Sequence, residues 1–250
     1  MNTAPLTLTA GPEVVAVVER LELGEPAPAA PGPTAPQPPH AVPYRAPEQV
    51  RVLPDVIEHV RGLRSVPGFR GAIVLAGRDH NRISVYSRFD AGTGSADRPV
   101  LDTVTARGVP ARTLDTRAYE LVWQDGEEPP ALVSIAHTPL VHFGLFTVLD
   151  GRTDALLDKV AASAPASLVT PGLRTVNFHR SLDGERLVNV GTWSTFDHFA
   201  TLLRQPGFTS AEKYWAGLAT FENDYFDVVE VVEDPTAGSP ARTPLTADAG

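Results

Sequence analysis

The stretch from Pro171 to Trp193, PGLRTVNFHRSLDGERLVNVGTW, constrains the fold most, because the same chain contains a second copy of its pattern. Moved back by 104 positions, it aligns without a gap on Pro67 to Phe89, PGFRGAIVLAGRDHNRISVYSRF. Five aligned pairs are identical: Pro67/Pro171, Gly68/Gly172, Arg70/Arg174, Asp79/Asp183 and Arg82/Arg186. These identities fall before the first strand and around the turn, where backbone geometry is most demanding. The sequence therefore predicts a duplicated domain.

Each copy has the pattern of a β-hairpin. In the second copy, Thr175 to His179 and Arg186 to Trp193 are rich in β-branched and aromatic residues, and a turn containing Gly184 joins them. Side chains alternate along a strand, so Asn189 and Trp193 must share one face. Four strand residues span about 13 Å. A ligand that touches both side chains must therefore be long and flat, as three or four fused rings are.

Length and composition bound the domain organisation. The chain has 250 residues, of which 42% are hydrophobic, and this is enough for two domains of about 100 residues each. We predict an N-terminal domain over residues 1–130, with a proline-rich insertion at 25–47 that holds nine of the 24 prolines. A C-terminal, catalytic domain is expected over 131–233, followed by a disordered tail at 234–250.

The expected elements follow the same order in both halves. The first half is predicted to contain strand 14–23, helix 52–63, hairpin 71–89, a weak helix at 100–106 and strand 118–124. The second half is predicted to contain strand 140–149, helix 153–162, the hairpin, two helical stretches capped at 194–197 and 209–212, and strand 225–232. This is the ferredoxin-like β-α-β-β-α-β order, with helices on one face of an antiparallel sheet. We therefore predict an α+β protein in which two tandem ferredoxin-like domains pack sheet to sheet as an intramolecular α+β barrel.

Composition also excludes some classes of function. The net charge of −9 argues against a nucleic-acid or anionic-membrane partner. The chain has no cysteine, which removes disulfides and thiolate metal ligands, and no His-x-His or HExxH spacing indicates a metal site. Neither a signal peptide nor an apolar run of membrane-spanning length is present in the sequence, so a cytoplasmic location is expected.

The hairpin pattern, with a helix directly after Trp193, resembles the antibiotic biosynthesis monooxygenase family of ferredoxin-like barrels. The resemblance covers residues 140–232 well and residues 14–124 in outline. Quinone-forming oxygenases of aromatic polyketide pathways in this family carry an Asn and a Trp four residues apart on the same strand, and the resemblance assigns these to Asn189 and Trp193. The tandem length is also similar to the ring-opening oxygenases of the jadomycin, gilvocarcin and kinamycin type of angucycline pathway.

The chain departs from the family pattern at several positions. A further tyrosine and arginine of the family have no clear match, since Phe199 and Lys213 stand near the expected places. In the first copy, Val85 and Phe89 occupy the positions of Asn189 and Trp193. If the pair is needed for chemistry, only the second half is catalytic and the first is its structural partner.

Individual residues have competing interpretations. Asn189 is either a structural amide bonded to a neighbouring backbone group or a neutral donor to a substrate oxyanion, worth ~3 kcal/mol in the transition state. Trp193 is either core or part of the site. Histidines near the hairpin are candidate bases for a phenol, and His179 is taken as the catalytic one with Asn189 and Trp193. The expected substrate-binding residues are His142, His198, Phe199, Tyr214 and Trp215.

The leading functional hypothesis is an oxygenase that uses O₂ to oxidise a polycyclic phenol or quinone, by hydroxylation or by oxidative ring opening. No tightly bound cofactor is expected if the substrate phenolate itself reduces O₂. The resemblance to ring-opening enzymes implies instead a diffusible reduced flavin, FADH₂ or FMNH₂, supplied by a flavin reductase. Two alternatives stay open: a haem-degrading relative, for which His198 lies early on its helix, and a non-catalytic binding protein. The chain is expected to form a pseudo-dimer internally, as a monomer or a homodimer.

Overall fold

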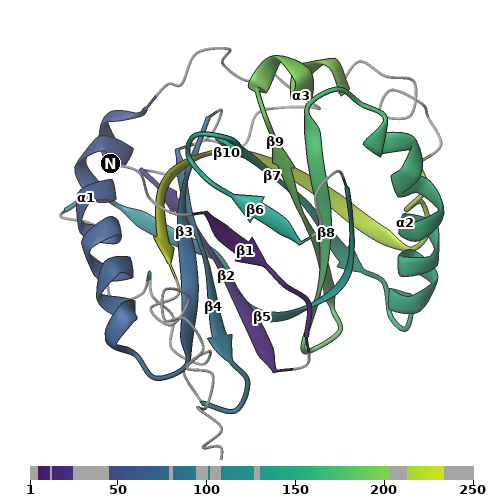
Figure 1. The fold of residues 1–250 in the computed structure, drawn as a ribbon, viewed down its shortest axis with the longest axis horizontal. Coiled ribbons are helices and arrows are strands. Elements are labelled where there is room, and N and C mark those ends of the chain that lie inside the picture. The colour runs from purple at the N-terminus through teal and green to yellow at the C-terminus, as the bar shows by residue number, and fades with distance from the viewer. Residues whose placement is uncertain are drawn as a thin grey trace, which may run out of the picture.

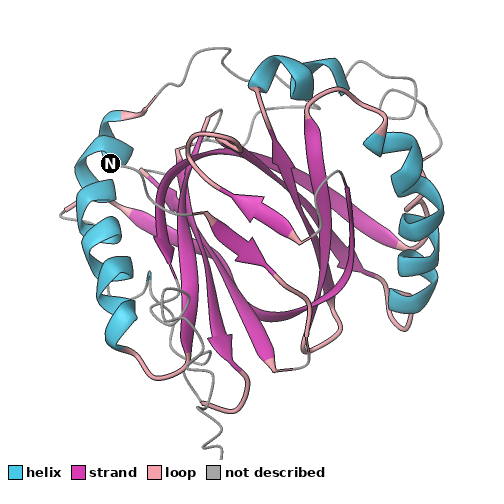
Figure 2. Cartoon of the chain, in the orientation of Figure 1, coloured by secondary structure: helices cyan, strands magenta, loops and turns pink. Residues whose placement is uncertain are grey.

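A computed structural model describes residues 5–11, 13–24, 45–78, 81–93, 101, 108–126, 130–202 and 213–233. It is an α+β structure built on a closed barrel of eight antiparallel strands (Figures 1 and 2). Around the barrel the strands follow the order β10 (Ala219–Glu233), β3 (Phe69–Gly77), β4 (Arg82–Asp90), β2 (Val14–Leu23), β5 (Ala111–Gly126), β8 (Leu173–Ser181), β9 (Arg186–Trp193) and β7 (Leu140–Val148). Strand β7 pairs again with β10, so the barrel has no free edge. The prediction of an α+β barrel is confirmed.

Helices cover the outer faces of the barrel. Helix α1 (Pro47–Gly62), which continues into the short 3₁₀ helix η1 (Leu63–Ser65), and helix α2 (Thr153–Leu168) lie on opposite sides of it (Figure 1). Helix α3 (Phe196–Leu202) follows β9 directly. Val52, Val56 and Val60 form the buried stripe of α1 and contact the outer face of β2, β3 and β4.

The barrel interior holds a second, two-stranded sheet. Strand β1 (Leu6–Leu8) pairs antiparallel with β6 (Ala131–Val133), and their side chains join the core formed by the inward-facing residues of the barrel. Leu8, Ala131 and Val133 have no exposed surface. Neither strand is predicted from the sequence pattern, because three residues are too short to show a strand periodicity.

The two hairpins have the same register. Phe69 pairs with Phe89 in the first copy, Leu173 pairs with Trp193 in the second, and a one-residue register shift follows each pair at the equivalent position. A one-residue shift exchanges the inward and outward faces of a strand. The aligned sequences therefore adopt the same local irregularity as well as the same strands.

The Pro-Gly pair that precedes each hairpin explains why these residues are identical in the two copies. Gly68 and Gly172 have φ of +76° and +81°, a region that side chains rarely adopt. The Gly68 carbonyl accepts a hydrogen bond from the Asp90 amide at 2.7 Å, and the Gly172 carbonyl accepts one from the Ser194 amide at 2.9 Å. Glycine is required here by backbone conformation.

Helix α1 begins earlier than predicted. It starts at Pro47 instead of Val52, because the Gln49 side chain accepts a hydrogen bond from the Ala46 amide at 3.1 Å and anchors the first turn. Gln49 also donates to the Gly77 carbonyl at 3.0 Å. The predicted insertion at 25–47 thus includes the first helical residue, and residues 25–44 lie outside the described part of the chain.

Other boundaries differ as well. Strands β5 and β10 are longer than predicted, and α2 continues to Leu168 with Pro165 inside it. The predicted second helical stretch of the C-terminal half is a turn at residues 214–218, where the Leu218 amide donates to the Trp215 carbonyl at 3.0 Å. The predicted helix at 100–106, apart from Leu101, the cap at 209–212 and the tail at 234–250 lie outside the described residues.

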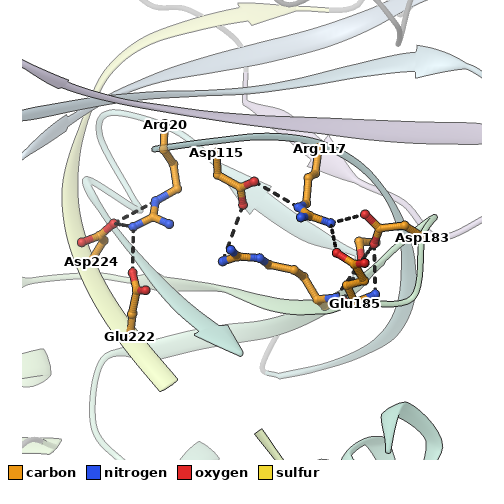
Figure 3. A network of polar contacts seen from close by, with 9 residues as sticks. Arg20, Asp115, Arg117, Asp183, Glu185, Glu222 and Asp224 are labelled. Carbon is orange, nitrogen blue, oxygen red and sulfur yellow. Dashed lines mark hydrogen bonds and ion pairs between the residues drawn. The ribbon is translucent and has the colours of Figure 1, made fainter. Parts of the chain in front are cut away.

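A network of ion pairs links strands from the two halves (Figure 3). Arg20 of β2 donates to Asp224 of β10 through Nη2 at 2.6 Å and Nε at 3.0 Å, and both side chains are buried. Arg117 of β5 contacts Asp183 and, at 3.1 Å, Glu185 in the turn between β8 and β9. These contacts hold β10 and the second hairpin against the first half of the chain.

Candidate functional site

A cavity of about 350 Å³ lies between the outer face of the second half of the barrel and α2. This volume falls within the usual range for small-molecule sites, which is roughly 300–1,000 Å³. Its aromatic walls are Phe146, Phe178, Trp193, Tyr214, Trp215 and Phe221. Helix α2 contributes small or short side chains, Val160, Ser163, Ala164, Ala166 and Ser167. The cavity exists because α2 presents little bulk to the sheet.

Strand register brings the polar residues of the cavity together. On the outer face, His142 of β7 lies opposite Gly191 of β9 on one side and opposite Tyr225 of β10 on the other. Gly144 of β7 lies opposite Asn189. Two glycines thus stand beside the two polar side chains, and Gly144 lines the cavity.

Asn189 makes the structural hydrogen bond that was one of its two predicted roles. Its Oδ1 accepts a hydrogen bond from the backbone amide of Asn177 at 3.0 Å, which fixes the orientation of the side-chain amide. Asn189 lines the cavity and is 9% exposed. The Nδ2 group therefore remains as the donor end, oriented by the backbone of β8.

Trp193 carries a buried donor that has no partner. The side chain is 1% exposed and lies edge-to-face against Phe199, with ring centroids 5.1 Å apart. Its Nε1 makes no hydrogen bond within the described part of the chain. An unpaired buried donor destabilises a fold, so its presence on a cavity wall indicates a site that a ligand acceptor can complete.

His142 is held as a neutral base. Its Nε2 lies 2.8 Å from Oδ1 of Asn223, and an amide oxygen can only accept, so Nε2 carries the proton and Nδ1 carries the lone pair. Burial lowers the pKa of His142 to about 4, against the opposing effects of the Asn223 hydrogen bond and the Asp224 charge. The ring stacks on Tyr225 at a centroid distance of 5.9 Å and contacts Phe199 at 5.3 Å.

The three polar side chains converge beside Gly191, so the expectation that a ligand must be long and flat to touch both Asn189 and Trp193 is wrong. A Cβ placed on Gly191 would lie 3.3 Å from His142 Nδ1, 3.4 Å from Trp193 Nε1 and 3.7 Å from Asn189 Nδ2. Two of these nitrogens are donors and one is an acceptor. Such a set of side chains can stabilise negative charge on a ligand and receive a proton.

The other predicted binding residues occupy different places. Tyr214 and Trp215 line the cavity from the turn before β10, and burial raises the pKa of the Tyr214 phenol. Phe199 lies behind Trp193 and His142 and does not line the cavity. His198 also stays outside the lining, because its Nδ1 contacts the hydroxyls of Ser194 at 3.2 Å and Thr195 at 3.0 Å.

His179, predicted as the catalytic base, lies on the opposite face of the sheet. Its Nε2 accepts a hydrogen bond from the Tyr86 hydroxyl at 3.0 Å inside the barrel, and its Nδ1 donates to the Asn177 carbonyl at 3.0 Å. Both ring nitrogens are thus satisfied, and burial lowers the pKa of His179 to about 4. The register shift near the start of β8 turns His179 inward and away from the cavity. His142 is the histidine that the structure brings to Asn189 and Trp193.

Asn223 was missed by the sequence prediction. The predicted last strand began at Tyr225, whereas β10 begins at Ala219. Extending the alternation of outward residues back from Tyr225 would have placed Asn223 and Phe221 on the same face, which is the face of His142.

Metal binding and membrane insertion need features that the described ranges of the chain do not show. No cluster of three or more His, Asp or Glu side chains suited to a metal ion occurs among those residues. None of the described helices has the length and apolar character needed to cross a membrane.

Comparison with known proteins gives similarity at the level of structure. No protein-family model and no curated protein sequence matches the chain. A solved structure named as an anthrone oxidase-like protein has a TM-score of 0.67 at 12% identity, covering 91% of this chain and 96% of its own. A candidate monooxygenase from Fusobacterium nucleatum subsp. nucleatum ATCC 25586 has a TM-score of 0.57 at 9% identity, covering 90% and 96%. A further candidate monooxygenase, from Lactobacillus acidophilus NCFM, has a TM-score of 0.51 at 10% identity, covering 89% of this chain and 97% of its own. The chain shares the fold of these proteins over almost their full lengths.

Proposed function

We propose that the chain is an oxygenase that oxidises a neutral polycyclic aromatic phenol, or its keto tautomer, with O₂. The observation that carries this proposal is the cavity wall, where flat aromatic side chains surround the N–H groups of Asn189 and Trp193. The described lining residues include no Asp, Glu, Lys or Arg, which favours an uncharged ligand. The names of the three structural neighbours, all oxygenase-like, agree with this class of reaction.

The reaction begins with loss of a proton from the substrate. An anthrone, the keto tautomer of a tricyclic phenol, becomes an enolate whose oxygen the N–H groups of Asn189 and Trp193 stabilise. The electron-rich ring carbon transfers one electron to O₂ and then forms a C–O bond with the resulting superoxide, which gives a hydroperoxide after protonation. Loss of water from the hydroperoxide leaves a quinone. In total, one CH₂ group and one O₂ become one C=O group and one water.

Reduced flavin, which the resemblance to ring-opening enzymes implies, does not suit this cavity. A flavin nucleotide carries phosphate, and the described lining offers no cationic side chain to bind it. The same cavity of about 350 Å³ would also have to hold the polycyclic substrate beside the flavin. We therefore propose the cofactor-independent reaction, in which flavin takes no part.

The remaining alternatives differ from this proposal in what the cavity must hold. Haem carries two propionates that need polar or cationic partners. The described lining of the cavity has no Lys or Arg side chain to pair with them. A Soret band on titration with haem would favour the haem-degrading alternative. A purely structural barrel would fill this face with side chains, whereas a cavity is present here. A binding protein without turnover remains the alternative that the activity assay decides.

The asymmetry of the two halves supports one site per chain. Within each half the sheet order is the same, β3-β4-β2-β5 and β8-β9-β7-β10, and we infer that the chain is a tandem of two ferredoxin-like units. In the first half Val85 and Phe89 stand where the second has Asn189 and Trp193, and both pack into the core beneath α1. The first unit then serves as the structural partner of the second.

The experiment is oxygen uptake by the full chain with anthrone, after subtraction of the spontaneous oxidation. We expect consumption of one O₂ for each anthraquinone formed, without added flavin. Phe89→Leu, in the first half, is the matched control and should keep the rate. Uptake that needs reduced FMN would replace the cofactor-independent mechanism with the flavin-dependent one. Absence of uptake under both conditions would reject the oxygenase function.

A further inference from the structure

The backbone ladder between β8 and β9 is interrupted next to Asn189. The last pair before the interruption joins Thr175 to Thr192. The next pair joins Phe178 to Asn189, so residues 176 and 177 of β8 stand outside the paired ladder. An interrupted ladder leaves backbone groups that need other partners, because a buried backbone N–H or C=O without a hydrogen bond is costly.

The first half has no such interruption at the equivalent place. Residues 72 and 73 of β3 correspond to residues 176 and 177, and they pair with Ser87 and Tyr86 of β4. Ile73 stands where the second half has Asn177. The two hairpins share their register, so the interruption comes from the side chains of the second half.

Two asparagine side chains supply the missing partners. Asn177 donates from Nδ2 to the Val190 carbonyl of β9 at 2.6 Å. The Asn177 backbone amide donates to Oδ1 of Asn189 at 3.0 Å. The amide of Asn189 is therefore held by a backbone group that is available because the ladder is open at Asn177.

The Asn177 side chain is itself fixed. It has no exposed surface, and its Nδ2 also donates to Oγ1 of Thr175 at 3.0 Å. Its Oδ1 accepts a hydrogen bond from Nε2 of Gln124 at 2.5 Å. Gln124 also donates to the carbonyl of Leu8, on the strand inside the barrel, at 3.1 Å. Both N–H groups and the oxygen of the Asn177 amide are thus bonded, which fixes the backbone beside it.

We propose that Asn177 is a positioning residue, which aims the Nδ2 group of Asn189 at a carbonyl oxygen of the substrate. The inference rests on the proposed function and assigns the origin of its oriented donor. A backbone N–H can only donate, so it binds the oxygen end of the Asn189 amide and leaves the Nδ2 end for the cavity that Asn189 lines. Without this contact the amide can present either end, and its oxygen would repel a substrate carbonyl.

The test compares anthrone with 9,10-dihydroanthracene, which has a CH₂ group in place of the carbonyl on the same tricyclic skeleton. Binding to the full chain is measured without O₂, through quenching of tryptophan fluorescence. We expect the wild type to prefer anthrone by about tenfold in Kd, because only anthrone accepts hydrogen bonds from Asn189 and Trp193. Asn177→Ala should bind both compounds and reduce the preference to about threefold, the share of the Trp193 N–H. Asn189→Ala should show the same reduced preference.

Ser84→Ala is the matched control. Ser84 is fully buried in the first half, and its Oγ donates to the Glu19 carbonyl of the neighbouring strand at 2.6 Å. It thus makes the same kind of contact, at the same distance, as Asn177 makes with Val190. This variant should lose stability and keep the tenfold preference for anthrone. An equal loss of preference in both alanine variants would overturn the proposal, because the effect would then be a general loosening of the barrel.

Turnover provides a second readout that a structural role would not produce. Asn177→Ala should lower kcat for anthrone about tenfold, since the donor of Asn189 is then aimed only part of the time. Asn177→Ala combined with Asn189→Ala should have the kcat of Asn189→Ala alone, because Asn177 acts through Asn189. Losses in kcat that multiply in the double variant would overturn the positioning role.

Asn177→Ser carries the test if Asn177→Ala does not fold. Its hydroxyl lies one bond short of the Nδ2 position, so the contact with Val190 is lost while a polar group stays beside Thr175. A tenfold preference for anthrone in this variant would overturn the proposal, as would a wild type that binds the two compounds equally. Because the binding comparison uses no O₂, it decides the role of Asn177 even if oxygen uptake fails and the oxygenase function is rejected.

Discussion

Replacing Trp193 with phenylalanine separates the stability of the site from its chemistry. The variant keeps an aromatic ring against Phe199 and removes the buried Nε1–H that has no partner. An unpaired buried donor costs about 1–3 kcal/mol, which the variant recovers. The lost ring atoms remove packing worth a similar amount, since each buried CH₂ contributes about 0.8 kcal/mol and a cavity adds to the loss. The two effects oppose each other, and the free energy of unfolding should change by no more than ~1 kcal/mol.

The rate should respond very differently. If Nε1–H stabilises the enolate oxygen, its removal should lower kcat by about 10²–10³, as loss of one oxyanion donor does. Urea unfolding gives the stability, and oxygen uptake with anthrone gives kcat and KM. The reasoning is refuted if Trp193→Phe keeps kcat within about threefold, because an indole N–H that leaves the rate unchanged does not bind the reacting oxygen.

Phe89→Leu is the comparison at the equivalent position of the first half. Phe89 is 1% exposed and contacts Phe69 edge-to-face with centroids 5.8 Å apart. The swap costs up to about 1.5 kcal/mol in packing and about 1 kcal/mol for the aromatic pair. This variant should therefore lose stability and keep kcat, the reverse of the pattern for Trp193→Phe. Equal kinetic loss in both would mean that the two halves share the chemistry.

Three further results are expected. Asn189→Ala should lower kcat about 100-fold, and urea unfolding should show a loss of about 1–3 kcal/mol because a backbone amide loses its acceptor. The free energy of unfolding should fall as the pH falls from about 6.5 to about 4, because burial lowers the pKa of His142 and of His179 to about 4 and the unfolded chain therefore binds protons at these residues first. His142→Phe should reduce by about half the slope of the free energy of unfolding against pH. An unchanged slope would show that His142 does not contribute to the pH dependence. Gly172→Ala should destabilise the chain far more than Gly184→Ala. Both glycines have positive φ, but a Cβ on Gly172 would lie 2.2 Å from the His198 ring, whereas a Cβ on Gly184 would face open space. Similar melting temperatures for the two variants would contradict this expectation.

The second strand of the C-terminal hairpin was predictable because its signal is local. Alternation along residues 186–193 places Asn189 and Trp193 on one face, and both side chains line the cavity. The duplication extended the same prediction to the first half, where the register proves identical. Local alternation is enough for a strand without irregularities, since each residue then fixes the side of the next.

The role of His179 was not predictable in the same way. Counting alternate residues from Leu173, which is outward, would place His179 outward too. The register shift between Leu173 and Thr175 reverses the alternation, so Phe178 faces the cavity and His179 faces the barrel interior. A one-residue shift has no clear mark in the sequence, and it decides which histidine is available. Strands β1 and β6 were missed because three residues are too short to show a strand periodicity, and their pairing joins segments more than 120 residues apart.

The difference between the two halves follows from the side chains that meet on each outer face. In the first half, Val17 and Val85 of the sheet meet Val52 and Val56 of α1 in one buried core. In the second half, the sheet presents glycines at two central positions, and α2 presents alanine and serine over the cavity. Both halves belong to one closed barrel, so the filled core of the first half stabilises the framework that the second half uses. An unpaired Trp193 donor and an open cavity are destabilising features, and a chain can keep them in one half when the other half and the interior core supply the stability.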